Sequence, residues 1–288
     1  MIYVGQSVHS RYVDGNLAKL ETELAQIEDA GADSCELILH CLDVVVGGQV
    51  ISARQAGVLD ILRAHNLRYT MHMPYDMNFQ TTEFLDLYVS AFRAGINFAQ
   101  TAGIEVLVHH FGKASTHDPA RLTQEIQVIK DFAESAPDLP FCMENPTFFT
   151  DFRGYSVGQS AESMISFVEH IGLPNVKLTF DVGHSFLNHR GNAEAVLQEL
   201  AQLLPYIRHV HLHDNCGLPF AMWENDYIHR LACGTADLHL PLGWGCAPIA
   251  QALALLKGTF NGTINLEIEE RFHDQYSESI ALVRRLLA

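Results

Sequence analysis

Val-Lys-Leu-Thr-Phe-Asp-Val-Gly-His, residues 176–184, is a short apolar run that ends in Asp181 and His184. Runs of this length and composition are typical of strands buried on both faces of a parallel sheet. Apolar residues then recur at helical spacing over 193–204, and a second run starts at Ile207 and ends in His-Val-His-Leu-His-Asp, residues 209–214. The order strand, helix, strand predicts a parallel βαβ unit.

The same alternation extends in both directions and covers the chain. Strands are expected to begin near Ile2, Ser34, Leu67, Ile104, Leu139, Val176, Ile207 and Thr263. Helices are expected over 17–27, 52–66, 84–103, 118–135, 161–172, 193–204, 248–256 and 277–287. Eight such units in 288 residues predict the α/β class, as a single (β/α)8 TIM barrel domain spanning 1–288. An open doubly wound sheet is the alternative, but it would be shorter or carry a second domain.

The composition is that of a globular protein with a large excess of negative charge. Lys and Arg number 18 against 34 Asp and Glu, which gives a formal net charge of −16. This charge argues against nucleic acid or an anionic membrane as the main partner. The six cysteines are dispersed and no apolar segment reaches the ~20 residues of a membrane span. We therefore expect a reduced, cytoplasmic protein with a small-molecule substrate, and leave open whether it is a homo-oligomer.

Side chains that bind metals follow the predicted strands at their carboxyl ends, where TIM barrels carry their active sites. They are His72, His109, His110, Glu144, Asp181, His184, His209, His211, His213, Asp214, Glu267 and Glu269. Carboxylates crowded at one mouth would repel each other, and a divalent cation relieves that repulsion. A mixture of imidazole and carboxylate suits zinc, with manganese or iron as alternatives.

Strand alternation narrows this set. His209, His211 and His213 share one face of their strand, and we favour His211 as the one that reaches the central site. His109 and His110 face opposite sides, so one of them at most points to the mouth. Glu267 and Glu269 share a face, and their spacing does not separate them.

Seven motifs occur in a fixed order between Val4 and Glu267. They are His-x-Pro-Tyr, His-Phe-Gly, Glu-Asn-Pro, Asp-Val-Gly-His, Val-His-Leu-His-Asp, Asp-Leu-His-Leu-Pro-Leu-Gly-Trp-Gly and Leu-Glu. The ordered set resembles the xylose-isomerase-like barrel superfamily, which includes sugar isomerases, sugar epimerases and the class IV apurinic endonucleases (AP endonuclease family 2).

The resemblance implies metal ligands residue by residue. Its isomerases and epimerases hold one divalent ion, and the matching positions here are Glu144, Asp181, His211 and Glu267. Its endonuclease branch holds three zinc ions, and the additional matching positions are His72, His110, His184, Asp237 and His239. It also selects His110 over His109. We therefore expect one to three ions.

The first functional hypothesis is a metal-dependent hydrolase with an endonuclease-like multinuclear site, acting on a small sugar- or phosphate-bearing substrate rather than on DNA. Glu144 would bridge two ions, and Glu267 would be a ligand or lie beside the attacking water. The alternative is a single-metal sugar or sugar phosphate isomerase or epimerase, in which Glu144 and Glu267 move the proton. A third hypothesis is a barrel that binds a metal or ligand without catalysis.

Candidate substrate-binding residues are cations and aromatic side chains in the loops after the strands. They are Lys113, Arg153, Arg190, Arg230 and Arg271, together with Trp223 and Trp244 of the long connection 213–246.

Overall fold

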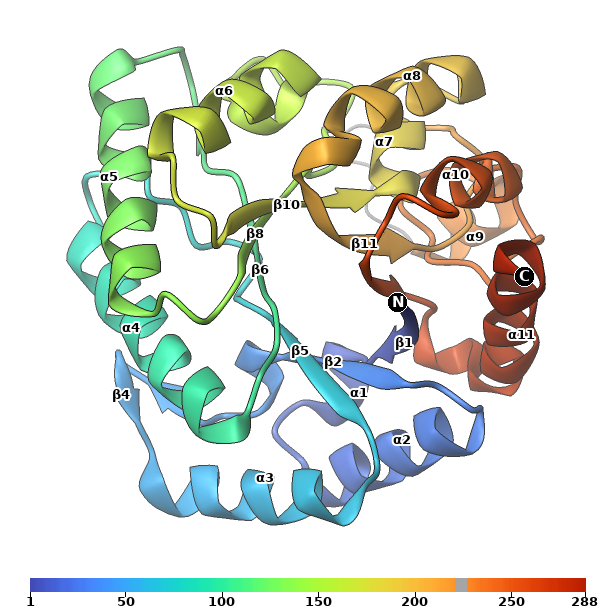
Figure 1. Cartoon of the computed structure of the whole chain (residues 1–288), viewed down its shortest axis with the longest axis horizontal. Helices are drawn as coiled ribbons and strands as arrows, with labels where there is room; N and C mark the ends of the chain where they lie inside the picture. The colour runs from blue at the N-terminus through green and yellow to red at the C-terminus, as the bar shows by residue number, and fades with distance from the viewer. Residues whose placement is uncertain (221–226) are drawn as a thin grey trace.

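The apolar runs form a closed barrel of eight parallel strands in the part of the chain that the structure describes (Figure 1). The structure is a computed structural model that describes residues 1–220 and 227–288, with side chains of the second segment from residue 230. The barrel strands are β1 (Ile2–Ser7), β2 (Ser34–Ile38), β5 (Arg68–His72), β6 (Leu107–His110), β8 (Phe141–Glu144), β10 (Val176–Asp181), β11 (Ile207–Leu212) and β12 (Gly262–Leu266). Each pairs with its neighbours in this order and β12 closes on β1, so the predicted (β/α)8 barrel is confirmed.

Amphipathic helices cover the outside of the barrel (Figure 1). They are α2 (Leu17–Asp29), α3 (Ser52–Ala64), α4 (Leu85–Ala102), α5 (Pro119–Ser135), α6 (Ala161–Ile171), α8 (Ala193–Leu203), α10 (Ile249–Leu256) and α11 (Tyr276–Leu287). Asp118 caps α5 by accepting the backbone N–H of Ala120, and Pro119 occupies the first turn, where no intrahelical donor is needed. Among the described residues, no helix has both the length and the apolar character of a membrane span.

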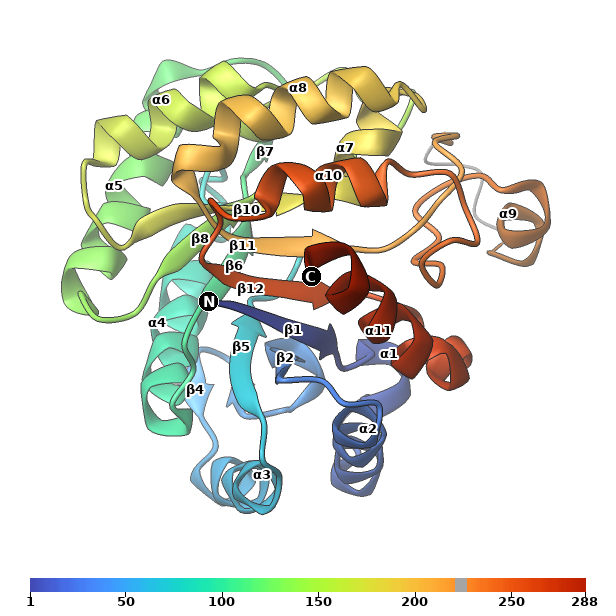
Figure 2. The same cartoon turned by 45° about the vertical axis from the view of Figure 1, so that its right-hand side comes forward.

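Shorter elements lie in the connections. Two small antiparallel pairs are β3 (Val45–Val46) with β4 (Gln49–Val50), and β7 (Lys113–Ala114) with β9 (Tyr155–Ser156). Short helices are α1 (Ser10–Val13), α7 (Val182–Asn188) and α9 (Tyr227–Cys233), with 3₁₀ turns at Leu39–Cys41, Val157–Gln159, Leu204–Tyr206 and Glu270–Gln275. Figure 2 shows α9 and the described segment that follows it beyond the arrowheads of β11 and β12. The described part of the long connection therefore lies at the carboxyl-end mouth.

Two strands begin later than the apolar pattern predicts. Ile104 and Val106 are buried, yet β6 begins at Leu107. Likewise Leu139 is buried, and β8 begins at Phe141. In both places the buried residues lie in the segment that enters the barrel, and before β6 this segment already exchanges backbone hydrogen bonds with β5, from Glu105 to Tyr69 and from Met71 to Val106.

Candidate metal centre

Four ligand candidates from consecutive strands meet at the carboxyl-end mouth. Glu144 ends β8, Asp181 ends β10, His211 lies on β11 and Glu267 follows β12. The Nδ1 atom of His211 lies 3.1 Å from a Glu144 carboxylate oxygen, 3.4 Å from one of Glu267 and 3.9 Å from one of Asp181. The structure thus brings together the quartet that the resemblance implies, and we name it the central site.

Glu144 also connects the central site to a second group. The Nε2 atoms of His72 and His110 lie 2.9 and 3.2 Å from its Oε2 atom, while Nδ1 of His184 lies 3.2 Å from its Oε1 atom. His109 instead packs against the ring of Phe79 in the core. His110 therefore faces the site and His109 does not.

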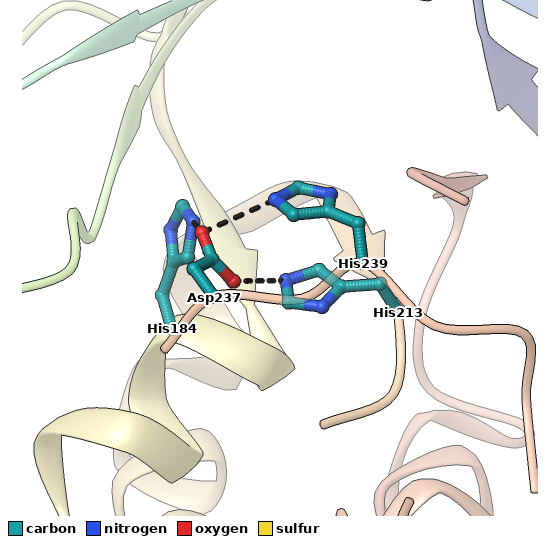
Figure 3. A group of neighbouring side chains, drawn as sticks. All are labelled: His184, His213, Asp237 and His239. Carbon is teal, nitrogen blue, oxygen red and sulfur yellow. Dashed lines mark hydrogen bonds and ion pairs between the residues drawn. The ribbon is translucent and has the colours of Figure 1, made fainter. Parts of the chain in front are cut away.

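A third group, the outer cluster, consists of His184, His213, Asp237 and His239 (Figure 3). Asp237 is at its centre: Nε2 atoms of His184 and His239 lie 3.1 Å from its Oδ2 atom, and Nε2 of His213 lies 3.4 Å from its Oδ1 atom. Figure 3 shows the four side chains pointing toward one another from α7, the end of β11 and the long connection.

The pKa values of the carboxylates in these groups are shifted in different directions. Burial alone raises the pKa of Glu144, but the imidazoles of His211 and His110 outweigh it and hold the pKa well below its usual range. The pKa of Asp237 is likewise held low, because His239 and His184 outweigh burial. For Glu267, burial raises the pKa and the charges of Glu144 and Asp181 add to the increase, against the opposing effect of His211.

The donor set fits divalent cations. Asp181 Oδ2 and Asp237 Oδ1 are buried carboxylate oxygens that accept no hydrogen bond from the described residues. Buried charges are normally paired or bound to metal. Ligand atoms lie within 4.8 Å of one another in the outer cluster, in the group of His72, His110 and Glu144, and, within the central site, in the group of Asp181, His211 and Glu267. The residues present could hold an ion in each group, and mixed imidazole and carboxylate ligands suit zinc, manganese or iron.

A cavity of about 320 Å³ opens above these groups. Its lining includes Glu144 and Glu267, and also Lys113 and Arg230 of the predicted substrate-binding set. This volume is at the lower end of the range for small-molecule pockets, which supports a substrate of modest size.

The other predicted substrate contacts lie elsewhere. Among the described residues that line the cavity, Arg153, Arg190, Arg271 and Trp244 are absent. Arg153 donates to the carbonyl oxygen of Thr150, Arg190 is exposed, Arg271 stacks on the Phe272 ring, and Trp244 is 56% exposed. These four side chains are not part of the cavity lining in the described part of the chain, and their contact with a substrate stays a prediction. Trp223 lies outside the described residues.

The chain is similar in sequence and in fold to known proteins. Residues 24–286 match the family model of the xylose isomerase-like TIM barrel. The chain belongs to this family. An uncharacterized protein of Methanocaldococcus jannaschii is 26% identical over 259 residues, which cover 86% of this chain and 78% of that protein.

Solved structures share the fold of this xylose isomerase-like barrel. A D-tagatose 3-epimerase-like protein has a TM-score of 0.73 at 22% identity, covering 99% of this chain and 98% of that one. An L-ribulose 3-epimerase has a TM-score of 0.71 at 16% identity, and the match covers 100% of this chain and 95% of that one. A D-psicose 3-epimerase has a TM-score of 0.70 at 14% identity, and the match covers 98% of this chain and 99% of that one. At these identities the likeness establishes the fold.

Sequence reasoning missed several residues of this xylose isomerase-like site. The preference for His211 leaves out His213, although the shared parity of the two residues places their side chains on the same face of the strand. Glu36, a lone carboxylate within an apolar strand, contacts His211 from inside the barrel. Arg11 adds a third cation to the cavity lining. No motif marks Arg11, and only the folded chain shows its position.

Proposed function

We propose that this protein is a divalent-metal-dependent isomerase or epimerase of a small sugar or sugar phosphate. The observation that carries the proposal is the central site: Glu144, Asp181, His211 and Glu267 converge, and two of these carboxylates face a cavity of about 320 Å³. Such a set, open to a pocket on one side, leaves room for substrate beside an ion.

The chemistry follows from the two carboxylates on the cavity wall. A divalent ion bound at the central site would supply Lewis-acid polarisation of a sugar carbonyl, which acidifies the neighbouring C–H group. One of the Glu144 and Glu267 carboxylates then accepts that proton, and the other returns a proton to the neighbouring carbon or to the opposite face. Asp181 and His211 lie deeper and hold the site in shape.

The cations on the cavity wall support an anionic substituent on the substrate. Lys113, Arg230 and Arg11 line the cavity together with the acidic groups, so the wall carries both signs of charge. A phosphate or carboxylate group could pair with the cations while the sugar carbons lie over the carboxylates.

The comparisons support isomerase chemistry over the hydrolytic hypothesis. Three structures that share this fold at high coverage are described as a D-tagatose 3-epimerase-like protein, an L-ribulose 3-epimerase and a D-psicose 3-epimerase. The additional histidines in the sequence favour hydrolysis, whereas the structural relatives favour the alternative, a sugar isomerase or epimerase.

Proton exchange tests the proposal directly. The metal-loaded protein would be incubated in D₂O with a panel of ketoses, aldoses and their phosphates, and C–H signals beside the carbonyl followed by NMR. We expect loss of one such signal and growth of an isomer or epimer, with both processes abolished by a chelator. Release of phosphate or of a sugar alcohol without deuterium exchange would contradict the proposal.

A second candidate, hydrolysis at a multinuclear centre, is favoured by one observation. Glu144 joins the central site to His72 and His110, and His184 joins it to the outer cluster. Elemental analysis of wild type and His239→Ala distinguishes the candidates. Three ions in wild type and two in the folded variant would favour hydrolysis, while one ion in both favours isomerisation.

A further inference from the structure

Glu36 is a fully buried carboxylate inside the barrel, on β2, away from the cavity wall. A buried carboxylate is costly unless its oxygens have partners. Thr70 on the adjacent β5 donates its hydroxyl to Oε2 at 3.1 Å, and His209 Nε2 lies 2.9 Å from the same oxygen. His211 Nε2 lies 3.0 Å from Oε1. Oε2 therefore accepts a hydrogen bond from Thr70, while the two imidazole nitrogens lie at ion-pair distance from the carboxylate without a hydrogen bond among the described residues.

The contact between Glu36 and His211 crosses the barrel interior. β2 and β11 are not neighbours in the sheet, since β1 and β12 lie between them. The His211 ring is therefore held at both edges: Nε2 faces Glu36, while Nδ1 lies 3.1 Å from Glu144 and 3.4 Å from Glu267. Only Nδ1 faces the central site.

We infer that Glu36 is a positioning residue that fixes the His211 ring so that Nδ1, and not Nε2, is presented to the ion of the central site. The inference rests on the proposed metal centre. A histidine that binds metal through one nitrogen commonly donates its other N–H to a carboxylate, which sets the tautomer and the ring orientation. His209 and Thr70 hold the Glu36 carboxylate in place for this task.

A rival arrangement uses the same residues. Glu36, His209 and His211 bring their ligand atoms within 4.8 Å of one another and could hold an ion themselves. That ion would lie inside the barrel and take Nε2 of His211. The two arrangements predict opposite ligation of one ring, so a measurement on the wild-type protein separates them.

Long-range ¹H–¹⁵N spectra of the zinc-loaded protein, labelled with ¹⁵N-histidine, report which nitrogen is protonated. The His211 signals would be assigned from the His211→Gln variant. We expect His211 to be bound through Nδ1 and protonated at Nε2. A ring bound through Nε2 overturns the inference. The measurement itself is made on the wild-type protein, and the His211→Gln variant is used only to assign the signals.

Metal affinity gives the second readout. Zinc would be titrated at pH 7 in competition with a fluorescent chelator, using Glu36→Gln and, as the matched control, Glu23→Gln. Glu23 is equally buried, but it accepts its hydrogen bond from the His9 backbone and contacts no candidate ligand. We expect Glu36→Gln to weaken one ion by about 10–100-fold at unchanged stoichiometry, as outer-shell carboxylates typically do, and the control to match wild type.

The outcomes separate this inference from the proposed function. Wild type that binds no divalent ion overturns both. Wild type that binds ions with the same affinity as Glu36→Gln overturns the positioning role and leaves the metal centre standing. Loss of a whole ion from folded Glu36→Gln at saturating zinc shows that Glu36 is itself a ligand, which also overturns the positioning role.

Discussion

Glu144 is a buried carboxylate and Glu267 a partly buried one at the same mouth, and their surroundings differ. Imidazoles of His72, His110 and His184 contact Glu144. Those of His211, His110 and His184 keep the pKa of Glu144 low despite burial. The pKa of Glu267 is raised mainly by burial, and the neighbouring carboxylates of Glu144 and Asp181 add to this increase. Paired carboxyl groups whose pKa values are pushed apart are suited to separate acid and base roles.

Glu267→Gln tests that division of roles. We expect kcat to fall by about 10²–10⁴-fold, because a positioned acid or base contributes about that much. The initial rate of deuterium exchange measures it, with the exposed Glu278→Gln on α11 as the control. Exchange at the wild-type rate in Glu267→Gln would remove this residue from the proton transfer.

At the scale of elements, the junction of β10 with α7 shapes the outer cluster. Asp181 caps α7 by accepting the backbone N–H of His184 at 2.7 Å. Gly183 then passes close to β11: a Cβ atom at this position would lie 2.1 Å from Cε1 of the His213 ring. The glycine of the Asp-Val-Gly-His motif is thus required by the approach of His213.

Gly183→Ala should therefore displace His213. We expect the folded variant to bind metal at the outer cluster at least about tenfold more weakly and to lose about 1–3 kcal/mol of stability, the usual cost of overpacking. Zinc titration and urea unfolding measure the two effects. Gly57→Ala is the control, because its added Cβ would meet only the end of the flexible Leu17 side chain, at 3.1 Å. Equal zinc binding in both variants would show that His213 is not a ligand.

Helix α2 carries a buried carboxylate that makes stability depend on pH. Burial raises the pKa of Glu23 from 4.5 to about 8, although the His9 backbone N–H opposes the change. Between these values the native protein keeps a proton that the unfolded chain releases. The contribution of Glu23 to stability is thus complete below about pH 4.5, falls as pH rises, and is lost above about pH 8.

Glu23→Gln should remove this dependence. Relative to wild type, its free energy of unfolding should rise with pH by up to about 1.4 kcal/mol per unit inside that window. Urea unfolding at several pH values between 5 and 9 measures the difference, and Glu278→Gln serves as the exposed control. If the free energies of unfolding of wild type and Glu23→Gln change with pH in parallel, the raised pKa of Glu23 is contradicted.

At the scale of the whole molecule, the barrel collects charge at one end. Side chains from β5 to the end of β12 meet at the carboxyl-end mouth, while the whole chain has a formal net charge of −16. Arg11, Lys113 and Arg230 are cations of the cavity wall, and they lie among carboxylates. This distribution suits a small anionic substrate better than a long polyanion.

We therefore predict weak binding to duplex DNA. A fluorescence anisotropy titration with an abasic duplex at physiological salt should show no submicromolar binding. Counterion release rewards clustered Lys and Arg, whereas the 18 Lys and Arg residues of this chain are outnumbered by 34 Asp and Glu residues. The same duplex with a known endonuclease provides the positive control. Tight, salt-sensitive binding would show that local charge outweighs the net charge.

The sequence by itself determined the alternation of strands and helices, hence the barrel and the end at which the candidate metal ligands lie. It also determined most ligand candidates, because motifs at strand ends are local and the barrel closure brings all strand ends together. It predicted His110 over His109 through the family resemblance, and the structure places them accordingly.

Only the tertiary structure decided the depth and partners of each side chain. Strand parity gives the face of a residue but not which residue lies opposite it across the barrel, so the contact of Glu36 with His211 could not be read from spacing. The same limit hid His213, whose partner Asp237 arrives on a long connection. Nor does spacing show that Arg153 and Arg190 lie outside the described cavity lining, because a flexible side chain after a strand turns inward only where neighbouring loops leave it a cavity to enter.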